Sequence, residues 1–147
     1  MSQLELNTDD LLLGVDIGGS HIAAASVSAR SFQIVEDSLF KTTVNATGTE
    51  DEVFEKWLQV INSAISKSPG NTVLGIGIAI PGPFDYENGI SHIQGVSKYD
   101  ALYGKNIREI LSRKLNTSLP IYFQNDAGCF GLGQVHLVKD ISLPFFL

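Results

Sequence analysis

The chain has 147 residues, of which 44% are hydrophobic and 18% charged, a length and balance that predict one globular domain able to bury a core. Its formal net charge of −6 provides no basic field to attract nucleic acid or an anionic membrane, so we expect neither as a partner. The sequence shows no signal peptide and no apolar run approaching the roughly 18 residues of a membrane helix, and we expect a cytoplasmic protein.

The first predicted strand ends beside a possible anion site. Residues 11–17 are apolar apart from Asp16 near their end, which predicts a buried strand, and the chain then turns through residues 18–20, the glycine turn, into a second strand from Ile22 to Val27. Glycines allow positive φ and let amide N–H groups converge on an anion, while a carboxylate nearby can hold Mg²⁺ against a phosphate. A simple hairpin capped by Asp16 explains the same residues, so both interpretations stay open here. The candidate phosphate and metal site consists of Asp16, Gly18, Gly19 and Ser20.

A third strand and a helix are predicted next. Residues 32–41 mix apolar and polar side chains and predict a third antiparallel strand, which completes a meander. Thr49 followed three residues later by Glu52 is a capping box, and apolar residues at helical spacing then continue to Ile65. Trp57 belongs to this apolar stripe, so we interpret it as a core residue rather than a ligand platform.

An apolar strand follows the predicted helix. Strand, helix and strand together predict a βαβ unit. Residues 72–80 are apolar throughout, as in a strand covered on both faces, and they end at Pro81-Gly82-Pro83. Ligands bind beyond the carboxyl ends of strands in such sheets, so we expect residues 81–83 at the same edge as the glycine turn. Residues 84–92 then predict a small hairpin that turns at Asn88-Gly89.

The remaining chain predicts a loop, a helix, a strand and a final helix. Residues 94–104 are polar and aromatic without a period, so we expect a loop over the site, from which Gln94 could reach a ligand. An amphipathic helix is predicted over 106–115, and a short buried strand over 120–124 ends at Asn125-Asp126. The small residues that follow suit a helix packed closely on a sheet, although three glycines weaken it.

Three predicted strands thus each end at a short polar or turn-forming motif. The order of these motifs resembles that in the N-terminal domain of the ROK family, which comprises bacterial sugar kinases and sugar-responsive repressors. Residues 16–20 resemble the family's phosphate loop, residues 77–83 its sugar-site glycine loop, and residues 124–127 its catalytic segment. The resemblance implies an α/β fold of the ribonuclease H-like, actin/hexokinase-like ATPase type. In that fold a three-strand antiparallel meander is extended by parallel strands, with helices on both faces.

The resemblance also assigns roles to residues. Asp126 would be the general base that takes the proton from a sugar hydroxyl as it attacks the γ-phosphate of ATP, although an aspartate here is also a good helix N-cap. Asn125 would fix a neighbouring hydroxyl, and Gly82 would let the backbone approach the sugar. Asp16 and the amides of the glycine turn would hold Mg²⁺ and phosphate. ATP and Mg²⁺ are the implied cofactors, and with a single cysteine, Cys129, we expect no structural zinc.

The predicted organisation is a tail over 1–10, a ROK-type domain over 11–134, and an apolar segment over 135–147 that begins a second domain. In complete ROK proteins the second domain carries the adenosine site. Because positioning of the γ-phosphate supplies most of the catalysis in phosphoryl transfer, we expect this chain alone to be inactive or very weak. We also expect it to form a homo-oligomer through the face that the second domain would cover.

The favoured function is therefore the N-terminal half of an ATP-dependent kinase for a hexose or N-acetylhexosamine, and two other functions are kept open. A non-catalytic sugar-sensing domain of a regulator would share the fold, but Asp126 and the absence of a DNA-binding helix before Leu11 count against it. A ribonuclease H-like nuclease also places acids at strand ends. The negative charge and the lack of a third suitable carboxylate count against that function.

Overall fold

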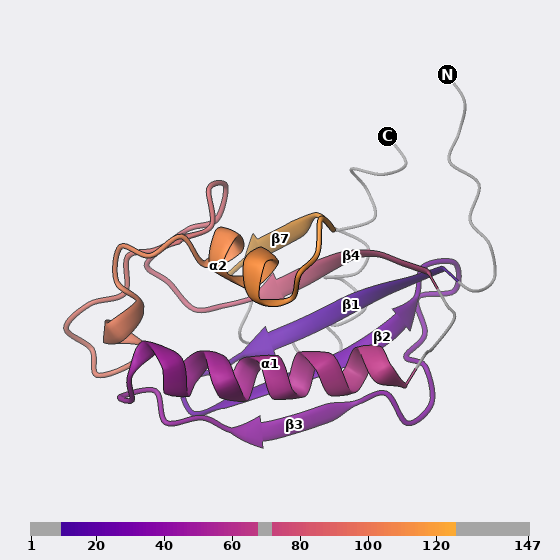
Figure 1. The fold of residues 1–147 in the computed structure, drawn as a ribbon, viewed down its shortest axis with the longest axis horizontal. Helices are drawn as coiled ribbons and strands as arrows, with labels where there is room; N and C mark the ends of the chain where they lie inside the picture. The colour runs from indigo at the N-terminus through magenta and orange to yellow at the C-terminus, as the bar shows by residue number, and fades with distance from the viewer. Residues whose placement is uncertain (1–9, 68–71, 126–147) are drawn as a thin grey trace.

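The structure, a computed structural model, describes residues 10–67 and 72–125. Five strands form one mixed sheet in the order β3-β2-β1-β4-β7 (Figure 1). The first three strands form an antiparallel meander, and β4 and β7 extend it parallel to β1, as the sequence predicts. These strands are β1 (Asp10–Ile17), β2 (His21–Ser28), β3 (Phe40–Thr43), β4 (Thr72–Ala79) and β7 (Ile121–Gln124).

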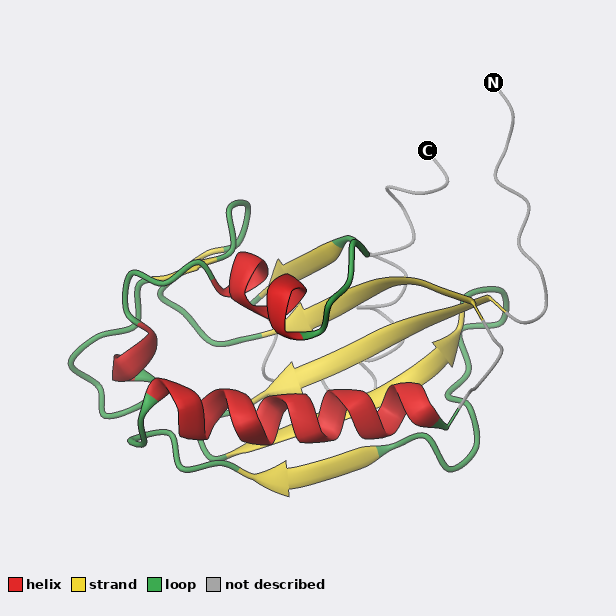
Figure 2. Ribbon diagram, viewed as in Figure 1, coloured by secondary structure: helices red, strands yellow, loops and turns green. Residues whose placement is uncertain are grey.

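Both described helices, α1 (Glu50–Ser66) and α2 (Ile107–Lys114), cover the same face of the sheet (Figure 2). They share the larger hydrophobic cluster with Leu13 and Val15 of β1. Because side chains alternate along a strand, Leu12 points to the other face, where it belongs to a second, smaller cluster. The helix predicted to follow Asp126 lies outside the described residues. Within 10–67 and 72–125, no helix is long and apolar enough to cross a membrane.

The third strand begins later than the sequence predicts, because residues 32–39 form a loop. Phe32 and Asp37 have φ values of 60° and 62°, in the left-handed region that a regular strand does not enter. The Ser38 hydroxyl accepts a hydrogen bond from the Ser26 amide at 3.1 Å and donates to the Ser26 carbonyl at 3.2 Å. Within the described residues, only one antiparallel bridge, Val27 with Ile34, remains of the pairing expected over 32–39. The Ser38 side chain satisfies the Ser26 amide instead of a strand.

A short hairpin lies between β4 and α2, as predicted, and it turns at Asn88-Gly89, where Gly89 has a φ of 79°. Its strands are β5 (Phe84–Asp85) and β6 (Ile90–Ser91). Arg108 of α2 connects the hairpin to the main sheet, because its guanidinium donates to the Glu87 carbonyl at 2.8 Å and to the Ile121 carbonyl at 2.9 Å. The hairpin, α2 and β7 are thereby held together.

The start of α1 has the capping box that the sequence predicts. The Glu52 amide donates to the Thr49 hydroxyl at 3.2 Å, and the Thr49 amide donates to the Glu52 carboxylate at 3.4 Å. Glu50 and Asp51 place further negative charge in the first turn, where the helix dipole is positive.

We predict that Thr49→Ala lowers the free energy of unfolding by about 1 kcal/mol, because the Glu52 amide loses its acceptor at the start of α1. Urea denaturation of the two proteins measures the difference. Thr49→Ser keeps the hydroxyl and is the matched control, with stability close to that of the wild type. Equal losses in both variants would show that the cap does not stabilise the helix.

Candidate functional site

The carboxyl ends of three parallel strands meet at one edge of the sheet. In the register of β1, β4 and β7, Asp16 pairs with Ala79, and Ala79 pairs with Gln124. The Ile80 amide donates to the Gln124 carbonyl at 3.0 Å, so β4 and β7 stay together to their last residues. The glycine turn, residues 81–83 and Asn125 therefore all leave the sheet at this edge, as expected from the sequence.

The glycine turn differs in conformation from the sequence prediction, because neither Gly18 nor Gly19 has a positive φ. Close packing explains the glycines instead. A Cβ on Gly18 would lie 2.9 Å from Cε1 of His21, and a Cβ on Gly19 would lie 3.0 Å from Cε of Lys98. The Gly18 amide donates to the His21 carbonyl at 2.8 Å, so within the turn the Gly19 and Ser20 amides are the ones left to face an anion.

Tyr99 anchors the glycine turn from a distant loop. Its hydroxyl donates to the Gly18 carbonyl at 2.5 Å, and its amide donates to the Ala46 carbonyl at 2.7 Å. The ring is fully buried and meets the indole of Trp57 edge to face, with centroids 5.5 Å apart. Burial raises the pKa of Tyr99 to about 12, so the hydroxyl stays neutral and keeps its proton to donate at physiological pH.

Sequence analysis did not identify Tyr99 as part of the site. The segment around it was predicted only as a loop, and a tyrosine in a polar loop gives no periodic signal. Its neighbours in space, the glycine turn and α1, come from sequence positions far from it. The one available signal is a large aromatic residue between Lys98 and Asp100, since an exposed loop gains little from such a side chain.

Gly82 and Asn125, both predicted to bind a sugar, lie next to each other. A Cβ on Gly82 would be 3.9 Å from Nδ2 of Asn125 and 3.2 Å from the hydroxyl of Tyr86. That hydroxyl donates to the Ile80 carbonyl at 2.9 Å, and burial raises the pKa of Tyr86. Gly82 and Asn125 are exposed to solvent. An open backbone segment and a carboxamide thus face solvent at the carboxyl edge of β4 and β7.

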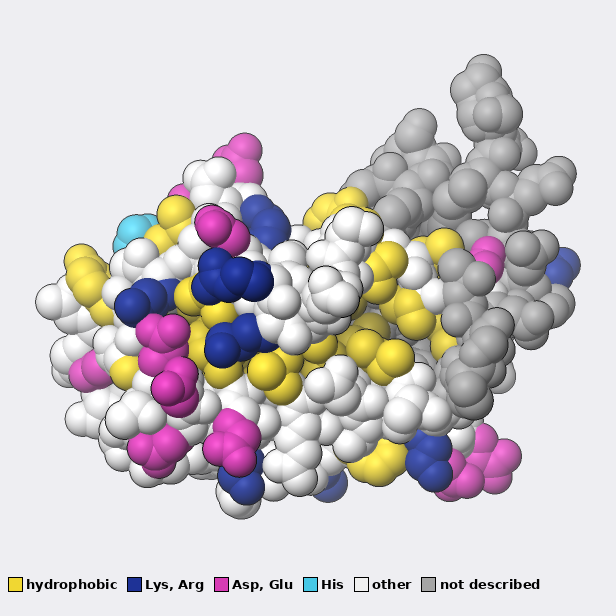
Figure 3. All heavy atoms as spheres, viewed as in Figure 1, with side chains coloured by type: hydrophobic (Ala, Val, Ile, Leu, Met, Phe, Trp, Pro, Cys, Tyr) yellow, Lys and Arg dark blue, Asp and Glu magenta, His cyan; other side chains and the backbone are white. Residues whose placement is uncertain are grey.

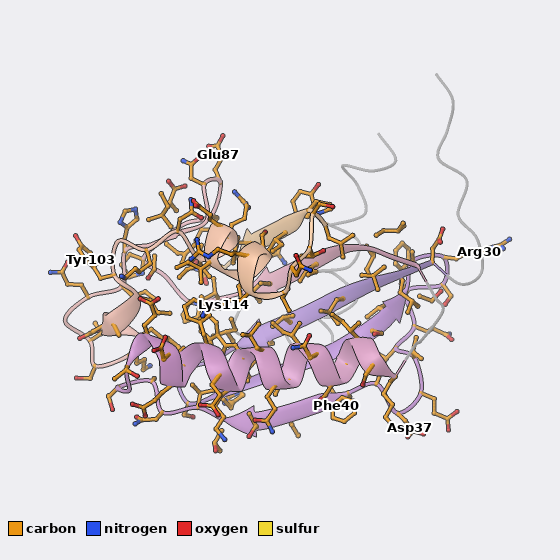
Figure 4. All side chains as sticks on the ribbon, in the orientation of Figure 1. Arg30, Asp37, Phe40, Glu87, Tyr103 and Lys114 are labelled. Carbon is orange, nitrogen blue, oxygen red and sulfur yellow. The ribbon has the colours of Figure 1, made fainter. Side chains whose placement is uncertain are left out.

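Gln94, the fourth predicted sugar contact, lines a hollow of about 370 Å³ together with Gly95, Asp100 and Tyr103. The hollow belongs to the loop that contains the 3₁₀ helix η1 (Asp100–Leu102). Figure 4 shows Tyr103 at the end of the molecule toward which β1 and β4 point. The structure thus places Gln94 on the loop at the functional edge, in a hollow lined by an aromatic ring and a carboxylate.

The remaining predicted residues are Asp16 and Asp126. Asp16 is 6% exposed at the carboxyl end of β1, beside the glycine turn. No group of three or more His, Cys, Asp or Glu side chains that could hold a metal ion occurs within residues 10–67 and 72–125. Asp126, predicted as the general base, lies outside the described residues, as does Cys129.

The fold and this edge define the class of protein first. An antiparallel meander extended by parallel strands, with a glycine turn after β1, is the ribonuclease H-like, actin/hexokinase-like fold of the solved structures that this chain resembles. The model of the ROK family matches residues 12–142, and the chain belongs to this family. The family predicted from the sequence is confirmed.

Curated relatives include both enzymes and a repressor. The chain is 28% identical over 139 residues to an N-acetyl-D-glucosamine kinase of Mannheimia succiniciproducens, covering 93% of the chain and 41% of that protein. It is 29% identical over 138 residues to a xylose repressor of Caldicellulosiruptor bescii, covering 89% of the chain and 32% of the repressor. The chain therefore spans about two fifths or less of the length of these relatives.

Solved structures support the same fold. A ROK family glucokinase from Streptomyces griseus, in complex with glucose and AMPPNP, superposes with a TM-score of 0.64 at 22% identity, over 93% of this chain and 37% of the glucokinase. A ROK family transcriptional regulator, a homologue of the E. coli MLC protein, gives a TM-score of 0.67 at 17% identity, over 91% of this chain and 33% of the regulator. Kinases and regulators thus share this domain.

We predict that Tyr99→Phe lowers the free energy of unfolding by about 1 kcal/mol at pH 7, because the Gly18 carbonyl loses its donor. Urea denaturation measures the loss. Tyr103→Phe is the matched control, since Tyr103 is 50% exposed, and its stability stays close to that of the wild type.

The difference between wild type and Tyr99→Phe also depends on pH. Tyr99 is protonated in both folded and unfolded protein below pH 10, so its contribution to stability is complete there. Between pH 10 and about 12 the unfolded tyrosine ionises while the folded one does not, which favours unfolding by up to about 1.4 kcal/mol per pH unit. The advantage of the wild type therefore shrinks across this range. A constant advantage up to pH 12 would contradict the buried, neutral hydroxyl.

Proposed function

We propose that the chain is the N-terminal half of a ROK-type sugar kinase, which binds a hexose or N-acetylhexosamine at Gly82 and Asn125. The observation that carries this proposal is that these two residues adjoin at the edge where the glycine turn also leaves the sheet. A sugar held there lies at the same edge as a phosphate held at the turn, and phosphoryl transfer requires the two to meet.

The chemistry of the edge suits a sugar. The Asn125 carboxamide both donates and accepts hydrogen bonds, so it can pair with neighbouring hydroxyls of one ring. Gly82 has no side chain to hold the ring away from the backbone. The similarity to an N-acetyl-D-glucosamine kinase makes N-acetylglucosamine the first substrate to test.

The phosphoryl donor in this proposal is ATP with Mg²⁺. Mg²⁺ usually binds proteins through one or two carboxylates together with substrate phosphates, and the single Asp16 carboxylate beside the glycine turn fits that pattern. When bound, the ion neutralises charge on the transferred phosphoryl group. Asp126 directly follows Asn125 in the chain, and as general base it would take the proton of the attacking hydroxyl.

The rest of a complete protein has to supply the adenosine site, because this chain spans only about two fifths of its kinase relative. Alone, we expect it to hold a sugar but to transfer phosphate very slowly or not at all. A sugar-sensing domain of a transcriptional regulator is the second candidate, favoured by the 29% identity to a xylose repressor. Phosphoryl transfer by the complete protein distinguishes the kinase from the sensor.

We predict that Asn125→Ala weakens sugar binding about tenfold or more, because it removes one or two hydrogen bonds worth about 1 kcal/mol each. Calorimetric titration of the chain with N-acetylglucosamine, glucose and N-acetylmannosamine measures the affinity. Asn62→Ala is the matched control, since Asn62 is exposed on α1, away from the predicted sugar contacts, and it leaves binding unchanged. Equal affinity of the Asn125→Ala and wild-type chains would contradict the proposed site, as would binding of none of the three sugars.

A further inference from the structure

We propose that Lys98 is a phosphate-binding residue, which completes the anion site of the glycine turn from the opposite loop. The inference rests on the proposed kinase function for its biological meaning, but it concerns a separate residue and a separate ligand. The ligand class is a phosphate group, either the terminal phosphate of the nucleotide or the phosphate of the sugar product.

The position of Lys98 is the first observation. Its side chain lies directly over the backbone of Gly19: from a Cβ built on that glycine, Cε lies 3.0 Å away, and Cδ and Nζ 3.2 Å. Any side chain at position 19 would displace the lysine. The ammonium therefore lies at the glycine turn, whose Gly19 and Ser20 amides form no hydrogen bond with the described residues.

The backbone around Lys98 is the second observation. Ser97 and Tyr99, on either side, have φ values of 58° and 57°, in the left-handed region that costs energy for residues other than glycine. The hydrogen bonds of Tyr99 to Ala46 and to Gly18 hold this conformation. The fold thus maintains an unfavourable backbone at the two residues that aim Lys98 at the turn.

The charge of Lys98 is the third observation. Other lysines with described contacts are occupied: Lys105 forms an ion pair with Glu50 at 3.1 Å, and the Lys114 ammonium lies 5.7 Å from the ring centre of Phe54. Figure 3 shows basic side chains gathered beside acidic ones over α1 and α2. Among the described residues, Lys98 has no ion pair, as is true of Lys41 and Lys56, and its position against the glycine turn is what distinguishes it.

These observations together indicate an anion rather than a structural role. In a chain with a net charge of −6, an ammonium without an acidic partner against a glycine turn with two unbonded amides provides a local attraction for an anion. A lysine ammonium is a compact point charge that binds phosphate oxygens without a fixed geometry, which suits a group that moves between donor and acceptor.

The loop of Lys98 also carries Gln94 and Asp100, and Tyr99 joins it to the glycine turn. Lys98 therefore links the phosphate site to the loop at the sugar edge. In the reaction its ammonium would lie against the phosphate oxygens and stabilise their charge, without giving or taking a proton.

The test is calorimetric titration of the chain with tripolyphosphate, which contains neither sugar nor adenosine. We expect Lys98→Met to weaken tripolyphosphate binding at least tenfold, and Lys98→Arg to keep it within about threefold. Lys105→Met, which removes the same charge elsewhere, leaves the affinity unchanged. Methionine keeps the apolar stem over Gly19, so Lys98→Met also keeps the urea midpoint of the wild type, which a merely structural lysine would not.

The proposal is overturned if the wild-type chain does not bind tripolyphosphate, if Lys98→Met binds as tightly as the wild type, or if Lys105→Met weakens binding equally. A parallel titration with N-acetylglucosamine 6-phosphate identifies the source of the phosphate. If Lys98→Met weakens tripolyphosphate binding alone, the group is the donor's terminal phosphate; if it weakens binding of both ligands, the same ammonium also holds the product's phosphate. Either result supports the site.

The outcomes also separate this inference from the proposed function. Sugar binding that depends on Asn125, together with tripolyphosphate binding that ignores Lys98, overturns the role of Lys98 and leaves the kinase proposal standing. Tripolyphosphate binding that depends on Lys98, with no binding of any sugar, keeps the phosphate site and contradicts the sugar kinase.

Discussion

The hydrogen bond from the buried Tyr99 hydroxyl to the Gly18 carbonyl connects the two parts of the structure on which the candidate site depends. One part is the central sheet, which ends β1 at the glycine turn; the other is the loop over 94–104, which has little regular structure of its own. The loop is fixed because the Tyr99 ring packs against Trp57 of α1 and its hydroxyl reaches the turn. The buried Tyr99 thus fixes the loop that carries the exposed Lys98 and the hollow beside Gln94.

The parallel register explains why the residues proposed to bind sugar and phosphate lie at one edge of the sheet. β1, β4 and β7 all point the same way, so the segments that follow them leave the sheet together. Arg108 and the small hairpin hold β7 beside β4, which sets Asn125 against Gly82. The curated relatives of the chain include both a kinase and a repressor.

Sequence patterns predicted the sheet, both described helices and the family, because these depend on periodicity and on local motifs such as the Thr49–Glu52 capping box. The prediction failed over residues 32–39, where the Ser38 hydroxyl replaces a strand partner for the Ser26 amide and the third strand begins only at Phe40. Gly18 and Gly19 also lack the positive φ that the sequence suggested, and the side chains of His21 and Lys98 lie close to them. Tyr99 and Lys98 were missed because their roles depend on contacts between distant parts of the chain, which no local pattern records.

The most direct test of the account is the ¹H–¹⁵N NMR spectrum of the labelled chain during titration with N-acetylglucosamine. The account predicts that the side-chain amide of Asn125 and the backbone amide of Gly82 shift together and saturate at one affinity. The amide of Arg30, at the opposite end of the sheet in Figure 4, should stay unchanged. Saturable shifts confined to the end of the sheet that carries Arg30, or no shift at Asn125, would contradict a sugar site at the carboxyl edge of β4 and β7.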